Sequence, residues 1–86
     1  MTEASGAEST AFVKNTVASG NRATALGSFT SALGNHSTAM GQETTASGFA
    51  STATGNETVA SGQSSFSGGE YSSAPGAYSI STGSVT

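Results

Sequence analysis

A glycine recurs every seven residues along this chain of 86 residues, and this regularity constrains the fold more than any other feature. Serine or threonine follows each glycine place by three residues, and alanine follows it by five. The unit G-x-x-[S/T]-x-A-x fills the chain end to end, which is typical of a repeat architecture and not of an enzyme. The residues out of step are Val13 at a glycine place, Ala23 at a Ser/Thr place, Ser67 and Ser81 at alanine places, and Gly68 outside the series.

The three small residues of each unit are spaced by two, which is the periodicity of a β-strand. Their side chains therefore point to one face, and two such faces can pack unusually close together. We expect each unit to form one short strand and one tight turn. The glycine is expected either at positive φ in the turn or where the opposing sheet comes closest.

A heptad repeat has two other interpretations. A coiled coil needs large apolar side chains at two places per heptad, and a glycine in every heptad would destabilise its helices. A disordered Gly/Ser-rich linker is the other alternative. Disorder does not require each residue type to recur at a fixed position, as it does here over twelve units. The pattern favours a parallel β-solenoid.

Two strands make one coil of such a solenoid, so the structural repeat is expected to be fourteen residues. Thr10, Thr24, Thr38 and Thr52 recur at that spacing, as do Phe12, Leu26 and Met40. The 84 residues from Thr2 to Val85 correspond to six coils, which at the usual strand spacing would stack about 29 Å tall. We predict an all-β fold, a parallel β-roll of 14-residue coils forming a single domain over residues 1–86. It begins and ends within a repeat, as a fragment of a longer chain would.

The side chains one and three places before each glycine alternate with the small ones and are expected to point out of the roll. One class of strands holds five large apolar residues at these places, and the other class holds three. The first class is therefore expected to form a buried oligomer interface. Its candidate residues are Phe12, Leu26, Met40, Phe66 and Ile80.

The fourteen-residue period also predicts side-chain ladders between adjacent coils. Glu8 and Arg22 are expected to form an ion pair, and Asn21 and Asn35 are expected to share amide hydrogen bonds. Glu43 and Glu57 would be like-charged neighbours. An exposed ion pair contributes less than ~1 kcal/mol, so these ladders do not decide the fold.

Composition excludes several classes of function. The chain has no cysteine, which rules out a disulfide scaffold and a thiolate metal site. Only Lys14 and Arg22 are basic and the net charge is −3, which argues against binding nucleic acid. No apolar run approaches the length needed to cross a membrane, so we expect no membrane insertion by this segment.

No motif indicates catalysis. His36 is the only histidine and there is no aspartate, so the serines lack the base and orienting acid of a hydrolase triad. The glycines match neither a P-loop nor a dinucleotide-binding fingerprint. We therefore expect no catalytic, metal or cofactor site, and the sequence names no ligand-binding residue.

The Ser/Thr-x-Ala-x-Gly skeleton resembles the head domain of YadA-like trimeric autotransporter adhesins, whose coils have a signature close to N-S-V-A-I-G. The nearest matches are residues 15–20, NTVASG, and 57–62, ETVASG. The resemblance implies a left-handed parallel β-roll, a homotrimer packed around a common axis, and no enzymatic activity. It also implies an extracellular site on a bacterial surface, anchored to the outer membrane through parts outside this sequence.

The expected function is an adhesive and structural module that attaches to a host matrix or another surface by multivalent binding. End-to-end self-association into a filament is an alternative, because unpaired strand edges at the ends of a solenoid template stacking. A phage tail-fibre segment is another, since the same roll occurs there. An ice-binding surface is a less favoured alternative. The threonines expected to line such a surface, Thr10, Thr24, Thr38 and Thr52, lie beside a column of Phe, Leu and Met and do not form a flat threonine lattice.

Overall fold

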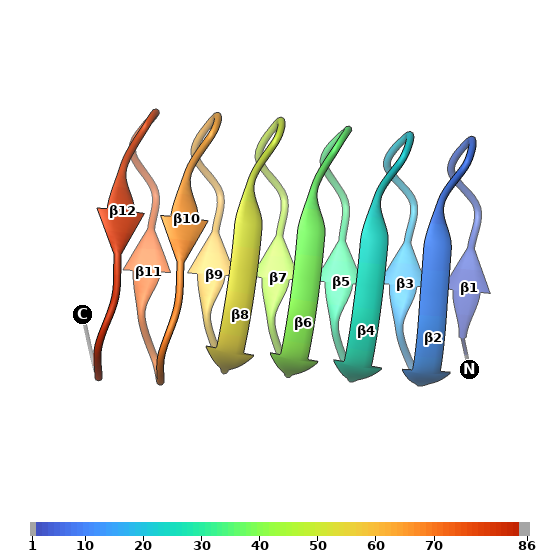
Figure 1. Ribbon diagram of the computed structural model, residues 1–86, viewed down its shortest axis with the longest axis horizontal. Helices are drawn as coiled ribbons and strands as arrows, with labels where there is room; N and C mark the ends of the chain where they lie inside the picture. Colours follow the sequence, from blue (N-terminus) through green and yellow to red (C-terminus); the bar gives the residue numbers. More distant parts are fainter. Residues whose placement is uncertain (1, 85–86) are drawn as a thin grey trace.

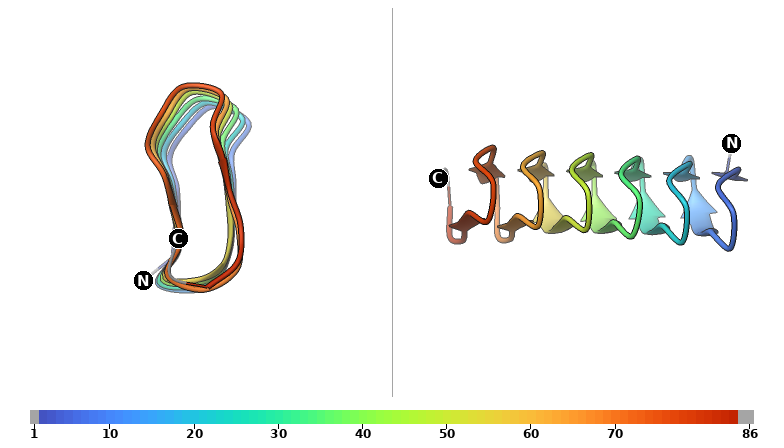
Figure 2. Two further views of the ribbon diagram at one scale, coloured as in Figure 1. Left: turned by 90° about the vertical axis from the view of Figure 1, so that its left-hand side faces the viewer. Right: turned by 90° about the horizontal axis from the view of Figure 1, so that it is seen from above.

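The computed structural model describes residues 2–84 as a flattened β-solenoid made of two parallel sheets of six strands each. The chain alternates between the sheets, so each coil contains one strand of either sheet and two turns (Figure 1). Viewed along the stack, the coils follow one elongated outline with a small progressive offset (Figure 2). The predicted all-β solenoid is confirmed. Over these residues no helix is long and apolar enough to cross a membrane.

The odd-numbered strands form sheet A and are all two residues long. They are β1 (Glu3–Ala4), β3 (Val17–Ala18), β5 (Ser31–Ala32), β7 (Thr45–Ala46), β9 (Val59–Ala60) and β11 (Ser73–Ala74).

The even-numbered strands form sheet B, and its first four members are five residues long. They are β2 (Thr10–Lys14), β4 (Thr24–Ser28), β6 (Thr38–Gln42), β8 (Thr52–Asn56), β10 (Phe66–Ser67) and β12 (Ile80–Ser81).

The pairing register confirms the fourteen-residue coil. Thr10 pairs with Thr24 and Phe12 with Leu26, each fourteen residues further along the chain. The same offset holds for every strand pair in both sheets. The longest dimension of the molecule is 29 Å, as expected for six stacked coils. The predicted end of the sixth coil at Val85 lies outside the described residues.

The interior consists of alanine, serine and threonine. Nine alanines form the buried apolar core, and threonine is the largest side chain that is fully buried. The buried hydroxyl residues are Thr16, Thr30, Ser37, Thr44, Ser51, Thr58, Ser65, Ser67 and Ser72. The prediction that the small residues face inward is confirmed, and their size explains the molecule's smallest dimension of 10 Å.

The heptad glycines perform two different tasks. In one class, which includes Gly27 and Gly41, φ lies near +120°, a region that favours glycine. A Cβ on Gly27 would also lie 2.0 Å from the carbonyl oxygen of Gly41 in the next coil. In the other class, which includes Gly20 and Gly34, φ is not in that region, and space alone restricts the residue. A Cβ on Gly34 would lie 2.1 Å from the carbonyl oxygen of Gly48 in the next coil. Of the two expected reasons for glycine, positive φ is found in the first class. Close approach of the opposing sheet is not found, because the crowding comes from the next coil of the same stack.

The turns between the two sheets contain a residue in the left-handed conformation, two places after the heptad glycine position. His36 and Phe29 are examples, with φ of 62° and 57°. Such a φ is costly for most side chains. It orients the backbone N–H along the stack, where that of His36 donates to the Asn21 carbonyl and that of Phe29 to the Lys14 carbonyl. The ladder of hydrogen bonds between coils therefore continues through the turns.

Candidate functional site

The outer face of sheet B displays two columns of side chains that run along the stack. Column 1 contains Thr10, Thr24, Thr38, Thr52, Phe66 and Ile80. Column 2 contains the residues two places further on in each coil, Phe12, Leu26, Met40, Thr54, Gly68 and Thr82.

The structure places the five predicted interface residues on this one face but divides them between the columns. Phe12, Leu26 and Met40 are successive neighbours in column 2. Phe66 and Ile80 are neighbours in column 1. Phe12 and Ile80 are the most accessible, with exposed fractions of 66% and 75%. The single chain thus leaves a band of large apolar side chains open to solvent, and their role as an interface stays a prediction.

No charged residue occurs in either column. The acidic and basic side chains of the described residues lie in the turns, at strand ends or in β1, as Glu8, Arg22, Lys14 and Glu3 illustrate. Apolar and threonine side chains without charge are typical of the core of a protein interface, where charges are depleted. The outer face of sheet A also lacks a continuous apolar column, because Val17 and Val59 are separated by Ser31 and Thr45.

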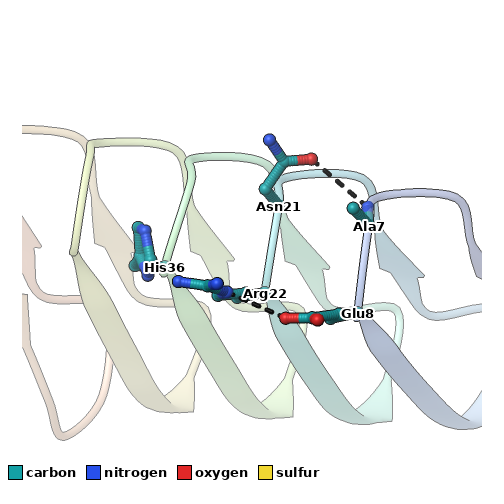
Figure 3. A pocket seen from close by; sticks show the side chains of 5 residues that line it. All are labelled: Ala7, Glu8, Asn21, Arg22 and His36. Carbon is teal, nitrogen blue, oxygen red and sulfur yellow. Dashed lines mark hydrogen bonds and ion pairs between the residues drawn. The ribbon is translucent and has the colours of Figure 1, made fainter.

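One edge of the solenoid contains an open pocket of about 260 Å³ between the first three coils. Its lining includes Glu8, Arg22 and His36, which follow one another at fourteen-residue intervals (Figure 3). The Nε of Arg22 donates to Oε1 of Glu8 at 2.9 Å, so the predicted ion pair is confirmed. Both side chains are more than 60% exposed, which limits the pair to less than ~1 kcal/mol.

Asparagines of the same turns stabilise the pocket rim. The Oδ1 of Asn35 accepts a hydrogen bond from the backbone N–H of Asn21 at 2.9 Å, and the Oδ1 of Asn21 accepts one from Ala7 at 3.2 Å. The predicted asparagine ladder therefore exists, but its bonds run from backbone to side chain and not between the two amides. Phe49 interrupts the ladder in the next coil and places its ring edge-on to His36, with centroids 5.6 Å apart.

The pocket offers hydrogen-bonding and charged groups without a catalytic arrangement. Within residues 2–84, no three His, Asp or Glu side chains are close enough together to hold a metal ion. On the opposite edge, the Nζ of Lys14 lies 5.9 Å from the ring centre of Phe29, a cation–π contact at an exposed site. These turns can offer weak polar and aromatic contacts to a partner.

Comparison with known proteins identifies the family. The model of the YadA head domain repeat matches residues 4–30, 18–44 and 41–65, well over half of the chain. The chain belongs to the YadA head domain family. Such repeats are structural modules of trimeric autotransporter adhesins, which are proteins of the bacterial outer membrane and cell surface. No curated protein and no solved structure shows significant similarity to the chain.

In this YadA head segment the sequence-based selection of residues missed Thr54 and Gly68. Both belong to column 2, and Gly68 is buried although it lies on the outer face. The available signal was that Gly68 is the one glycine outside the heptad series. Its meaning depends on the position of the Phe66 ring, which the sequence does not give.

Proposed function

We propose that this segment is an adhesive head module that forms a homotrimer through the outer face of sheet B. Phe12, Leu26, Met40, Phe66 and Ile80 are the proposed contact residues. The observation that supports this most strongly is that small side chains fill the interior and large apolar side chains lie on the surface. Every fully buried side chain is Ala, Ser or Thr, while the large apolar side chains lie partly or largely exposed.

The interior contributes little hydrophobic free energy because alanine buries little apolar surface. Several buried hydroxyls, including those of Thr16, Thr30 and Thr44, have no hydrogen-bond partner among the described residues, which costs further free energy. Ordering the chain opposes folding at every residue. Burying the exposed apolar band against further copies would supply the missing stabilisation, and contiguous exposed apolar surface is typical of interaction sites.

In the proposed assembly the head projects from the cell surface and attaches to host matrix or another surface. The turns leave charged and aromatic side chains such as Arg22, His36 and Tyr78 exposed. Each such contact is weak, but three copies engaging together raise the overall affinity without a new contact. The threonines of column 1 lie beside the large apolar side chains of Phe12, Leu26 and Met40. This arrangement favours a protein interface over an ice-binding surface, which would need a flat lattice of threonines.

Two leucines on opposite faces provide a matched test. Leu26 lies on the outer face of sheet B, and Leu33 follows β5 of sheet A. We expect Leu26→Ser to shift the assembly toward monomer at least tenfold in sedimentation equilibrium at micromolar concentration. Leu33→Ser, which removes the same side chain from the other face, is expected to leave the mass unchanged. An unaltered trimer in Leu26→Ser, or dissociation in Leu33→Ser alone, would contradict the proposed interface.

A further inference from the structure

Gly68 occupies an outer-face position where the fold does not require glycine for its backbone. Its φ does not lie in the left-handed region, in contrast to that of Gly69, the heptad glycine that follows it directly. Its Cβ would not meet backbone of the next coil, as the Cβ atoms of most other glycines would. The reason for glycine must therefore be a neighbouring side chain.

That neighbour is the ring of Phe66. A Cβ on Gly68 would lie 3.3 Å from Cε2 of Phe66 and 3.3 Å from Oγ1 of Thr54. The ring thus extends from column 1, where its Cα lies, across the strand into the place that a column 2 side chain would fill. It covers Gly68, which is why that residue is buried on the open face.

The ring consequently restores the apolar series of column 2. Going along the stack, this column presents Phe12, Leu26, Met40, Thr54 and then the Phe66 ring in place of a side chain on Gly68. Column 1 presents threonine in its first four coils. Ile80 lies next to Phe66 in column 1 and is the one predicted interface residue outside the column 2 series.

We infer that the three-fold axis of the homotrimer runs along column 2, and that the Phe66–Gly68 pair is a side-chain exchange that keeps the fifth coil in contact with that axis. The inference rests on the proposed homotrimer. The partners are two further copies of this chain in parallel register, because such an axis brings each layer against its own equivalents: Phe12 on Phe12, Leu26 on Leu26. The column 1 threonines then flank the axis and contact the neighbouring copy less closely.

Two threonines of β8 test the position of the axis. Thr54 belongs to column 2 and Thr52 to column 1, so Thr54→Cys and Thr52→Cys place the same thiol two residues apart on one strand. The chain has no other cysteine. A disulfide requires Cα atoms within ~7 Å. Under mild oxidation we expect Thr54→Cys to give a covalent dimer with up to about two-thirds of the chains, because two of three thiols meeting at an axis can pair.

Thr52→Cys is expected to remain largely monomeric on denaturing gels. If the Thr52→Cys variant forms a covalent dimer, the Thr54→Cys variant does not, and both still sediment as trimers, the proposed axis position is overturned. The proposed homotrimer would be unaffected by that result. If both variants and the parent chain instead sediment as monomers, the homotrimer on which the inference rests is contradicted.

A double substitution tests the exchange itself. Phe66→Thr combined with Gly68→Leu gives the fifth coil the Thr/Leu pattern of Thr24 and Leu26. Phe66→Thr alone is expected to increase trimer dissociation about tenfold or more, because column 2 then has a gap. The double variant is expected to recover most of that loss. If the double variant dissociates as readily as Phe66→Thr alone, while circular dichroism shows that its fold is intact, the proposed exchange is overturned.

Discussion

Most heptad positions require glycine because they leave no room for a Cβ atom. The residues of the Gly20 class lie against the backbone of the next coil, so an added Cβ would meet a rigid carbonyl and not a flexible side chain. Coil spacing is set by the hydrogen-bond ladder and cannot expand at one place without breaking neighbouring bonds. The repeat of glycine therefore follows from the stack itself.

Gly34→Ala and Gly76→Ala test this requirement with the same substitution. A Cβ on Gly34 would lie 2.1 Å from the Gly48 oxygen, while one on Gly76 would meet nothing nearer than Ser79 at 3.8 Å. We expect Gly34→Ala to lower the free energy of unfolding by more than about 3 kcal/mol. Gly76→Ala is expected to change it by less than about 1 kcal/mol. Chemical denaturation at equal protein concentration measures both, and equal effects would contradict the crowding described.

Val13 is the one heptad place without glycine, and it retains the backbone of that place, with φ of 87°. A β-branched residue in this conformation costs of order 1–3 kcal/mol. Val13→Gly is therefore expected to raise the free energy of unfolding by about 1 kcal/mol, after allowance for the greater entropy of glycine in the unfolded chain. Val17→Gly is the control, since Val17 is not at positive φ, and it should destabilise. Thermal melts that show the same loss for both variants would refute the strain at Val13.

At the scale of the strand and turn, the sequence was sufficient to predict the coil length, the inward face and the residues that pair. Each followed from a strict period together with the alternation of a strand. It did not predict that the strands of sheet B are longer than those of sheet A. That difference depends on which backbone groups meet between coils, and both strand classes have the same residue pattern.

The candidate site was less predictable than the fold. The apolar residues of one strand class were correctly assigned to one face, and the ion pair of Glu8 with Arg22 was confirmed. The position of the Phe66 ring over Gly68 depends on the side-chain rotamer of Phe66. Periodicity alone does not specify a side-chain rotamer.

Ser67 of the fifth coil and Ser72 at the start of the sixth form a buried polar pair, where the preceding coils have alanine and threonine. The Oγ of Ser72 donates to the Gly68 carbonyl at 2.8 Å, so the 2.7 Å contact between Ser67 and Ser72 requires Ser67 to be the donor. Ser72→Ala removes the acceptor of Ser67 and is expected to cost about 1–3 kcal/mol. Ser67→Ala alone should cost little, since Ala53 fills the equivalent place in the coil before.

A double-mutant cycle measures the coupling of this pair. Adding Ser67→Ala to Ser72→Ala should recover part of the loss, because the Ser67 hydroxyl that had lost its acceptor is then removed. The expected coupling is 0.5 kcal/mol or more, within the range of ~0.5–3 kcal/mol for residues in contact. Strictly additive effects in urea denaturation would show that the two hydroxyls do not act as a pair.

For the whole molecule, the arrangement of residue sizes is the reverse of an ordinary globular domain. The inside is built from Ala, Ser and Thr, and Phe, Leu, Met and Ile lie toward the outside. Backbone hydrogen bonds between coils order the chain, and the outer face of sheet B remains available for burial against other copies. We therefore expect the stable folded unit to be three chains and not one.

Sedimentation equilibrium of the purified 86-residue chain across micromolar concentrations distinguishes a trimer from a monomer. The chain mass is 8.3 kDa, and we expect a single species of about 25 kDa, three times that mass. Circular dichroism on the same samples should show β-structure. A folded species that remains at 8.3 kDa over the whole range would show that the single chain is the stable unit.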